Sequence, residues 1–415
     1  MRRFAVAVLL AAAGCHSPPR ARALAPPPPE GVSTSGCEAA WSADPRVCLE
    51  AWATGLPGAR GLAFAPNGDL FVVSRGAGLV VLWDANHDGV SGPGERATFA
   101  KEGGNHGLAI HGGYVYASSA VEVFRYRYEP GERRAPQAAE VVVHGLPAGG
   151  HVTRTLLFDA QGQLLVSAGS ASNVDRVSAP ETTRAVIRRF DLARLPPGGF
   201  PWTAGETFAT GLRNEVGLAL DARGRVWGVA NGRDGLVVDG VDIHDDNPAE
   251  ELHRFEVPGR FYGYPFCWTS WKWPGHGPSG TKHLDPDVPG GHDEAWCQNP
   301  ANVAPQLAVM QAHLAPLGLV FYDGALFPNY RGQLFIAAHG SWDRTPPVGR
   351  TLLHAQVGAD GDIHEVTTFL GELSPRGQLR EGVWKYRPVD LAVGPDGALY
   401  FSDDAAGTIQ RVGRR

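Results

Sequence analysis

A short apolar hairpin recurs along this chain, and the repeat constrains the fold more than any other feature. Each copy has an apolar run, a turn with a central glycine, a second apolar run, and then small or polar residues. A hairpin cannot bury a core alone, so the copies must pack on one another. We therefore predict an all-β fold, a six-bladed β-propeller, in preference to an irregular β-sandwich. The copies occupy residues 61–75, 107–119, 155–170, 217–232, 319–341 and 390–404.

The residues next to the hairpins differ from copy to copy, and we expect them to carry the function. In a propeller the first strand of each hairpin lines the central channel, so residues just outside the hairpins meet at one mouth. A histidine there can accept a proton near neutral pH, and arginines there indicate an anionic ligand. The candidates are Arg75, His106, His151, Arg213, Asn214, His339 and Arg387.

Composition narrows the class of protein. The 415 residues carry a formal charge of −6, with 19% charged and 43% apolar residues, as in an ordinary globular protein. No basic excess indicates nucleic acid, and no apolar run is long enough to span a bilayer. We expect neither a nucleic-acid partner nor a transmembrane segment.

The first residues have the pattern of an export signal. A charged start, a short apolar run and small residues predict a signal peptide over 1–14. The AAAGC ending resembles a bacterial lipobox, which predicts lipidation of Cys15; ordinary signal cleavage nearby is the alternative. A proline-rich linker over 15–36 would then hold a propeller domain over 37–415 off the membrane. We expect an exported protein, anchored only by lipid, on the periplasmic face of a bacterial membrane.

Four further cysteines predict disulfides, because the chain is expected to be exported. We predict the pairs Cys37–Cys48, near the N-terminus, and Cys267–Cys297, across a long loop. The other pairings would tie together segments that the repeat gives no reason to bring close.

Residues 84–95, DANHDGVSGPGE, match the calcium-loop pattern D-x-[DN]-x-[DN]-G-x5-E. Gly89 permits the sharp turn that such a loop needs. The flanking segments have strand patterns, so we predict a calcium loop without helices; a polar turn is the alternative. The predicted ligands are the side chains of Asp84, Asn86, Asp88 and Glu95 and the carbonyl oxygen of Val90.

A second group of oxygen ligands follows the fourth hairpin. Asp245 and Asp246 precede Asn247, Glu250 and Glu251 within one loop. This grouping predicts a second metal site, with a solvated acidic loop as the alternative.

Two later segments bring cations and an aromatic ring to the predicted mouth. His339, Trp342 and Arg344 lie within six residues, and a tryptophan beside cations can stack on a flat ligand while the cations hold its carboxylates. Lys385 and Arg387 are two apart, and we expect them on one face of a strand. No Walker or dinucleotide-binding glycine pattern is present, so a nucleotide is not indicated.

Several segments together resemble one family, over roughly residues 45–412. GGHVTRTL, GSASNVD, GLRNEVGL, ANGRDGL, DIHDDNPAEELHRF, YGYPFCW, HGSWDR and YRPVDL are similar to the glucose/sorbosone dehydrogenases, above all to the pyranose dehydrogenase branch. The resemblance implies a six-bladed quinoprotein that uses pyrroloquinoline quinone (PQQ), with calcium at the cofactor and at structural sites. Asp343 departs from the asparagine usual at that position in the branch.

The resemblance also implies roles for single residues. His151 matches the general base, which would remove a hydroxyl proton while hydride passes to the quinone, and Arg75 is grouped with it. Calcium would polarise the reacting carbonyl. The residues that match cofactor contacts are Arg213, Asn214, His339, Trp342, Arg344, Lys385 and Arg387.

The sequence thus predicts a PQQ-dependent dehydrogenase that oxidises an aldose, a pyranose or a related sugar or polyol. No Cys-x-x-Cys-His pattern is present, so we expect electrons to pass to a separate acceptor, a cytochrome or a quinone. Two other classes stay open. A calcium-dependent propeller lactonase or esterase would need a metal held by carboxylates and asparagines, and a lipid-anchored binding propeller would need no base. The cations at the mouth favour the quinone.

Overall fold

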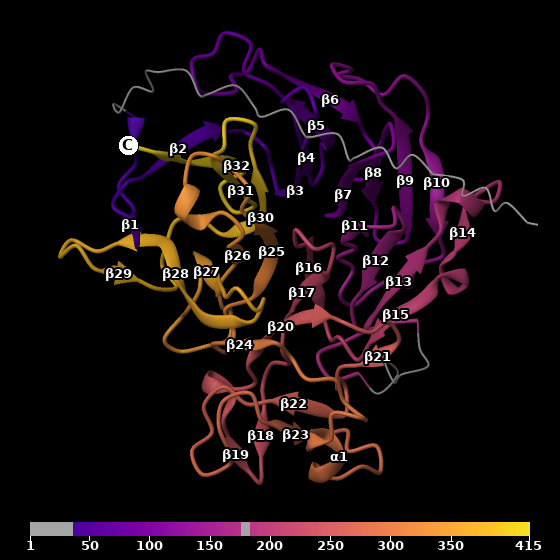
Figure 1. Ribbon diagram of the computed structural model, residues 1–415, viewed down its shortest axis with the longest axis vertical. Helices are drawn as coiled ribbons and strands as arrows, with labels where there is room; N and C mark the ends of the chain where they lie inside the picture. Colours follow the sequence, from indigo (N-terminus) through magenta and orange to yellow (C-terminus); the bar gives the residue numbers. More distant parts are fainter. Residues whose placement is uncertain (1–35, 176–182) are drawn as a thin grey trace, which may run out of the picture. The chain divides into compact units, whose positions relative to one another are not determined.

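The structure is a computed structural model that describes residues 36–175 and 183–415. These residues form six antiparallel blades arranged as a propeller (Figure 1). Each predicted hairpin supplies the first two strands of one blade, so the predicted fold is confirmed. The innermost strands pack on one another around the channel. They are β3 (Ala59–Phe64), β7 (Leu108–His111), β11 (Leu156–Phe158), β16 (Glu215–Leu220), β25 (Pro316–Phe321) and β30 (Pro388–Val393).

The outer strands follow in order within each blade. The second strands are β4 (Leu70–Ser74), β8 (Tyr114–Ser118), β12 (Leu164–Ala168), β17 (Val226–Ala230), β26 (Leu334–Ala338) and β31 (Leu399–Asp403). The third strands are β5 (Gly78–Leu82), β9 (Glu122–Arg127), β13 (Val186–Phe190), β20 (Glu250–Phe255), β27 (Thr351–Val357) and β32 (Thr408–Arg414). The fourth strands are β6 (Arg96–Ala100), β10 (Glu140–His144), β15 (Glu206–Thr210), β24 (Ala308–Met310), β28 (Ile363–Leu373) and β2 (Val47–Ala53).

We number the blades 1 to 6 in the order of their innermost strands, so that blade 1 contains β3 and blade 6 contains β30. Blade 6 is completed by a strand from the other end of the sequence. Strand β2 pairs antiparallel with β32, with Val47 opposite Arg414. The predicted disulfide Cys37–Cys48 is confirmed, and it ties the segment before β2 to that strand. The ring of blades is therefore closed by hydrogen bonds between residues far apart in sequence.

The core consists of six apolar layers, one between each pair of neighbouring blades. Strand β4 shows how the sequence builds them, because successive side chains of a strand point to opposite faces. Leu70 and Val72 pack toward blade 6, while Phe71 and Val73 pack toward blade 2. A strand buried on both faces needs the continuous apolar runs that the hairpins carry.

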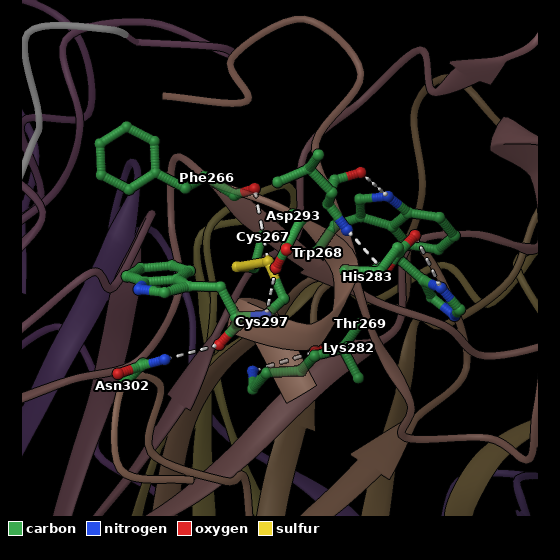
Figure 2. The surroundings of a disulfide bond; sticks show 12 residues. Phe266, Cys267, Trp268, Thr269, Lys282, His283, Asp293, Cys297 and Asn302 are labelled. Atoms are coloured by element: carbon green, nitrogen blue, oxygen red, sulfur yellow. Dashed lines mark hydrogen bonds and ion pairs between the residues drawn. A yellow bond between two sulfur atoms is a disulfide. The ribbon is translucent and has the colours of Figure 1, made fainter. Parts of the chain in front are cut away.

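No helix in 36–175 or 183–415 is long and apolar enough to cross a membrane. Within these two ranges, several short strands, a short helix and 3-10 turns lie in the loops between the blade strands or at the edges of the blades. The second predicted disulfide, Cys267–Cys297, is confirmed and joins β22 (Cys267–Thr269) to the short helix α1 (Glu294–Gln298) (Figure 2). Beside it, the Lys282 ammonium donates to the Thr269 hydroxyl at 3.1 Å. These elements are β1 (Trp41–Ser42), β14 (Phe200–Pro201), β18 (Val237–Val238), β19 (Val241–Asp242), β21 (Arg260–Phe261), β22 (Cys267–Thr269), β23 (Lys282–Leu284), β29 (Leu379–Arg380) and α1 (Glu294–Gln298), with 3-10 turns at Leu192–Arg194, Trp202–Ala204, His244–Asp246 and Pro328–Tyr330.

Candidate active site

The segments that precede the innermost strands and follow the second strands meet at one end of the channel, which we call the channel mouth. Hydrogen bonds from side chains connect neighbouring blades there. The Ser118 hydroxyl donates to the Arg154 carbonyl, and the Asn231 amide donates to the Pro316 carbonyl. Four innermost strands, β3, β16, β25 and β30, contain a register shift at this end. Such bulges re-aim side chains, so the mouth is where residues specific to each blade can converge.

His151 lies at the mouth in the segment that leads into β11, with its ring held in one orientation. The Ser170 hydroxyl gives its hydrogen to the Ser172 carbonyl at 2.7 Å, so its lone pair must accept from His151 Nδ1 at 2.9 Å. This pattern assigns the tautomer with hydrogen on Nδ1 and a lone pair on Nε2. Burial, and next the charge of Arg213, lowers the pKa of His151 to about 4. The residue is therefore a neutral imidazole that can accept a proton at Nε2.

Arg213 and Asn214 lie beside His151. A Cβ atom added at Gly169 would meet the Cβ of His151 at 2.6 Å and Asn214 Oδ1 at 2.7 Å, so the two side chains flank the same glycine. The buried guanidinium of Arg213 donates to Asn173 Oδ1 at 2.9 Å and pairs with Asp234 at 3.0 Å. These contacts fix its position next to the imidazole.

A connected group of charged side chains lies on the side of the mouth formed by blades 1 and 6. Buried Arg60 pairs with Asp404 at 2.8 Å and donates from Nε to His106 Nδ1 at 3.1 Å. Asp404 also contacts His339 Nε2 at 2.9 Å. Burial lowers the pKa of both histidines, that of His106 well below its usual range. The sequence missed Arg60 and Asp404, because Arg60 lies inside an apolar strand pattern and only the bulge in β3 turns it toward the mouth.

Three arginines lie next to this group of charged side chains and have no carboxylate partner among the described residues. Arg387 donates to the carbonyls of His339 and Gly340 at 3.2 and 3.1 Å, and Arg350 donates to the Trp384 carbonyl at 3.2 Å. Arg75 donates to a backbone carbonyl at 3.4 Å. Burial, and next the charge of Arg350, lowers the pKa of Arg387. Neighbouring guanidinium groups without acidic partners fit a ligand that carries carboxylates.

Lys385 is not on a strand face with Arg387, and that part of the prediction is wrong. Strand β30 begins at Pro388, and the Lys385 side chain is 64% exposed and pairs with Glu38 at 2.7 Å. The turn that precedes the strand carries Lys385 toward the N-terminal segment, while Arg387 turns into the mouth.

Two other predicted cofactor contacts lie in the loop after β26. Trp342 is 76% exposed, so it covers little protein surface. Arg344 pairs with Asp246 at 2.9 Å, in the loop before β20. Their predicted contacts with a cofactor stay predictions.

The second predicted metal site is not formed. Glu250 and Glu251 are successive residues of β20 and therefore point to opposite faces. Glu250 accepts from the backbone of Gly232 at 2.7 Å, while Glu251 pairs with Lys282 at 2.9 Å. Asn247 instead accepts from a backbone N–H at 2.9 Å. The structure uses these oxygens to hold loops, so they do not converge on one ion.

In the first predicted metal loop, unlike the second, the acidic side chains converge. Carboxylate oxygens of Asp84, Asp88 and Glu95 lie within 4.8 Å of one another in the loop between β5 and β6. Gly89 has the positive φ of 87° that the turn requires. The loop thus gathers its acidic side chains at one point.

The fold and the mouth define a class: six-bladed propellers that hold a histidine and a group of arginines at one end of the channel. Residues 42–415 match the model of the TrAA12-like family, and the chain belongs to this family. A PQQ-dependent sugar dehydrogenase of Hypocrea jecorina is 32% identical over 397 residues, which cover 88% of each chain.

Solved structures agree with this assignment. The calcium structure of a Trichoderma reesei family AA12 enzyme superposes with a TM-score of 0.80, at 30% identity, covering 91% of this chain and 98% of that one. The holo PQQ domain of a pyranose dehydrogenase from Coprinopsis cinerea gives a TM-score of 0.78, at 28% identity, covering 91% and 97%.

Proposed function

We propose that the protein is a PQQ-dependent dehydrogenase that oxidises an aldose, a pyranose or a related sugar and passes the electrons to a separate acceptor. The observation that carries this proposal is the mouth itself. It places a neutral histidine with an open Nε2 beside Arg213 and Asn214, on the same mouth as the three arginines without acidic partners. The named relatives support the cofactor and the substrate class, and they do not favour a lactonase or a binding propeller.

The residues of the mouth fit PQQ, a flat o-quinone with three carboxylates. Arg75, Arg350 and Arg387 would hold carboxylates through charge-assisted hydrogen bonds. Arg213 and Asn214 would donate to the quinone oxygens. When bound, PQQ would accept the two electrons that leave the sugar.

His151 would take the proton of the sugar hydroxyl at Nε2. Its Nδ1–H would stay on Ser170 throughout, which keeps the ring oriented and leaves the Nε2 lone pair to accept the proton. The charge of Arg213 disfavours the imidazolium, so the proton is released again readily. The base is thereby reset for the next turnover.

Calcium is a further part of the proposal. The Asp84–Glu95 loop would bind one ion through the gathered carboxylates and so stabilise blade 1. A second ion would accompany the cofactor, as the family resemblance implies.

We also propose export and lipid anchoring. The signal pattern and Cys15 lie outside the described residues, so this proposal rests on the sequence alone. Mass spectrometry should find a diacylated or triacylated cysteine at residue 15 as the mature N-terminus. An unmodified N-terminus elsewhere would contradict the anchor.

Reconstitution tests the catalytic proposal. The protein mixed with PQQ and calcium should show the cofactor's altered absorption and should reduce an artificial acceptor with at least one sugar of a panel. His151→Ala should retain the absorption change but lose about 10²–10⁴-fold in turnover, because the general base is removed.

Two arginine-site variants separate anchoring from catalysis. Arg387→Ala should weaken PQQ binding, since it removes a partner for a carboxylate. Lys385→Ala is the matched control: its ammonium pairs with Glu38, so binding should be unchanged. A wild-type protein that binds no PQQ would overturn the proposed function. Normal turnover by His151→Ala would move the base to another residue.

A further inference from the structure

Three side chains with metal-binding atoms converge beside the mouth, and Asp234 among them also pairs with Arg213. Asp234 follows β17, His313 precedes β25 and Asp343 follows β26. His313 Nδ1 lies 3.5 Å from Asp343 Oδ1 and 3.9 Å from Asp234 Oδ1. The three ligand atoms lie within 4.8 Å of one another, and the His313 side chain is only 6% exposed.

The hydrogen bond on the far side of the ring fixes what Nδ1 offers. His313 Nε2 lies 2.5 Å from the backbone carbonyl of His244, and a carbonyl can only accept. Nε2 therefore carries the hydrogen, and in the neutral ring Nδ1 has a bare lone pair. That lone pair makes no hydrogen bond among the described residues and points at two carboxylate oxygens.

The carboxylate of Asp343 also has an acceptor atom without a hydrogen-bond donor. Its Oδ1 atom is buried and has no hydrogen-bond partner among the described residues. A buried acceptor without a partner is costly, and three acceptors that face one another also repel. A cation between the three atoms, either a metal ion or a proton on Nδ1, would offset both costs.

We propose that Asp234, His313 and Asp343 form a binding site for a divalent transition metal of the zinc type. With zinc bonds of about 2.0–2.2 Å, tetrahedral ligand atoms are separated by about 3.4 Å, close to the two distances observed from Nδ1. One nitrogen and two carboxylate oxygens suit zinc, whereas calcium takes six to eight oxygens.

The surroundings match those of metal ligands. A ligating histidine usually donates its other N–H to a carbonyl or carboxylate, as His313 does to His244. A ligating carboxylate is usually hydrogen-bonded in turn, and Asp234 Oδ2 accepts from Arg213 at 3.0 Å. The Asp234 side chain is 24% exposed, so solvent reaches one side of the cluster.

Direct metal analysis tests the site without PQQ or activity. The untagged full chain, stripped with a chelator and dialysed against micromolar Zn²⁺, should retain one zinc per chain. Asp343→Asn should lower the affinity at least about tenfold, the range seen when metal-site partners are lost. His313→Gln should abolish binding. Bound Co²⁺ should give the intense visible bands of a tetrahedral site in wild type only.

Two controls keep the result interpretable. His364→Gln removes an exposed histidine elsewhere and should leave zinc binding unchanged. Should His313→Gln fail to fold, Asp343→Asn decides the matter, because it preserves the shape of the side chain. Equal zinc retention by wild type and Asp343→Asn would overturn the proposal. An NMR spectrum that shows the His313 ring doubly protonated at neutral pH in zinc-containing buffer would also overturn the proposal. In that case the imidazolium, and not a metal ion, would be the cation beside the two carboxylates.

Discussion

His151 and His253 show how the surroundings of a histidine set its pKa. His151 is buried beside Arg213, and its pKa is lowered to about 4. Burial alone would also lower the pKa of His253, but Glu215 and Glu251 raise it to about 9. Both ring nitrogens of His253 lie within hydrogen-bond distance of carboxylates, at 3.2 and 3.0 Å, so both carry hydrogen. The first histidine is free to accept a proton, and the second is a fixed cation inside blade 4.

The lowered pKa of His151 makes a prediction for the cofactor-free protein. An unfolded histidine takes up a proton near pH 6.5, but folded His151 does so only near pH 4. The unfolded state therefore binds more protons in this window, and stability falls as the pH drops through it. Between pH 7 and pH 5, wild type should lose more free energy of unfolding than His151→Ala, measured by urea denaturation. NMR titration of the ring should place its midpoint near pH 4, and a midpoint near 6.5 would contradict the environment described.

The sequence could predict part of the site at this scale. His151, Arg213 and Asn214 could be predicted to lie close together because they stand at equivalent places beside hairpins, and the repeat carries that geometry. Arg60, Asp404 and Arg350 were missed, because bulges and loop paths that no short pattern encodes turn them inward. Lys385 was misplaced for the same reason: the residue where a strand begins depends on tertiary pairing.

At the scale of elements, the β5–β6 loop is held by its own carboxylates. Glu95 accepts from the backbone of Ala85 at 2.7 Å and of Gly92 at 2.9 Å, and Asp84 accepts from Gly89 at 3.0 Å. These hydrogen bonds restrict the backbone of the loop around its carboxylates. Little ordering entropy then opposes ion binding.

We predict that calcium stabilises this loop and the blade that carries it. Wild type should melt at a higher temperature in calcium than in chelator; binding at 100 times Kd stabilises a protein by about 2.7 kcal/mol. Glu95→Gln should reduce this difference, because it removes a charged ligand. Glu381→Gln, at an exposed position, serves as the control in the same calorimetric scans. Identical melting of wild type with and without calcium would show that the loop is only a polar turn.

At the scale of the molecule, stability depends on closing the ring. Each blade buries its two faces against its neighbours, so an open ring would expose the faces on either side of the gap. Strand β2 prevents this, since Leu49 packs toward blade 5 and Trp52 toward blade 1. The repeat predicted the number of blades, but β2 lies outside every hairpin copy, so the sequence pattern gave no signal for the closure.

We predict that the disulfide beside β2 supports this closure. The Cys37–Cys48 link spans 11 residues, for which loop entropy corresponds to about 2–3 kcal/mol. The double variant Cys37→Ser/Cys48→Ser should unfold at lower urea concentration than wild type. The Cys267→Ser/Cys297→Ser variant, which opens only a loop outside the ring, provides the comparison. Equal midpoints for the first variant and wild type would show that β2 needs no covalent support.

The pairing of β2 with β32 also sets the order of events during biosynthesis. Residues 47–53 leave the ribosome long before residues 408–414, and at about 5–20 residues per second the interval is tens of seconds. Throughout that time the earlier strand has no partner and its apolar side chains are open to aggregation. Cys37 and Cys48 are close in sequence, so under oxidising conditions they can join before the last blade has formed, which would hold the strand in a local loop.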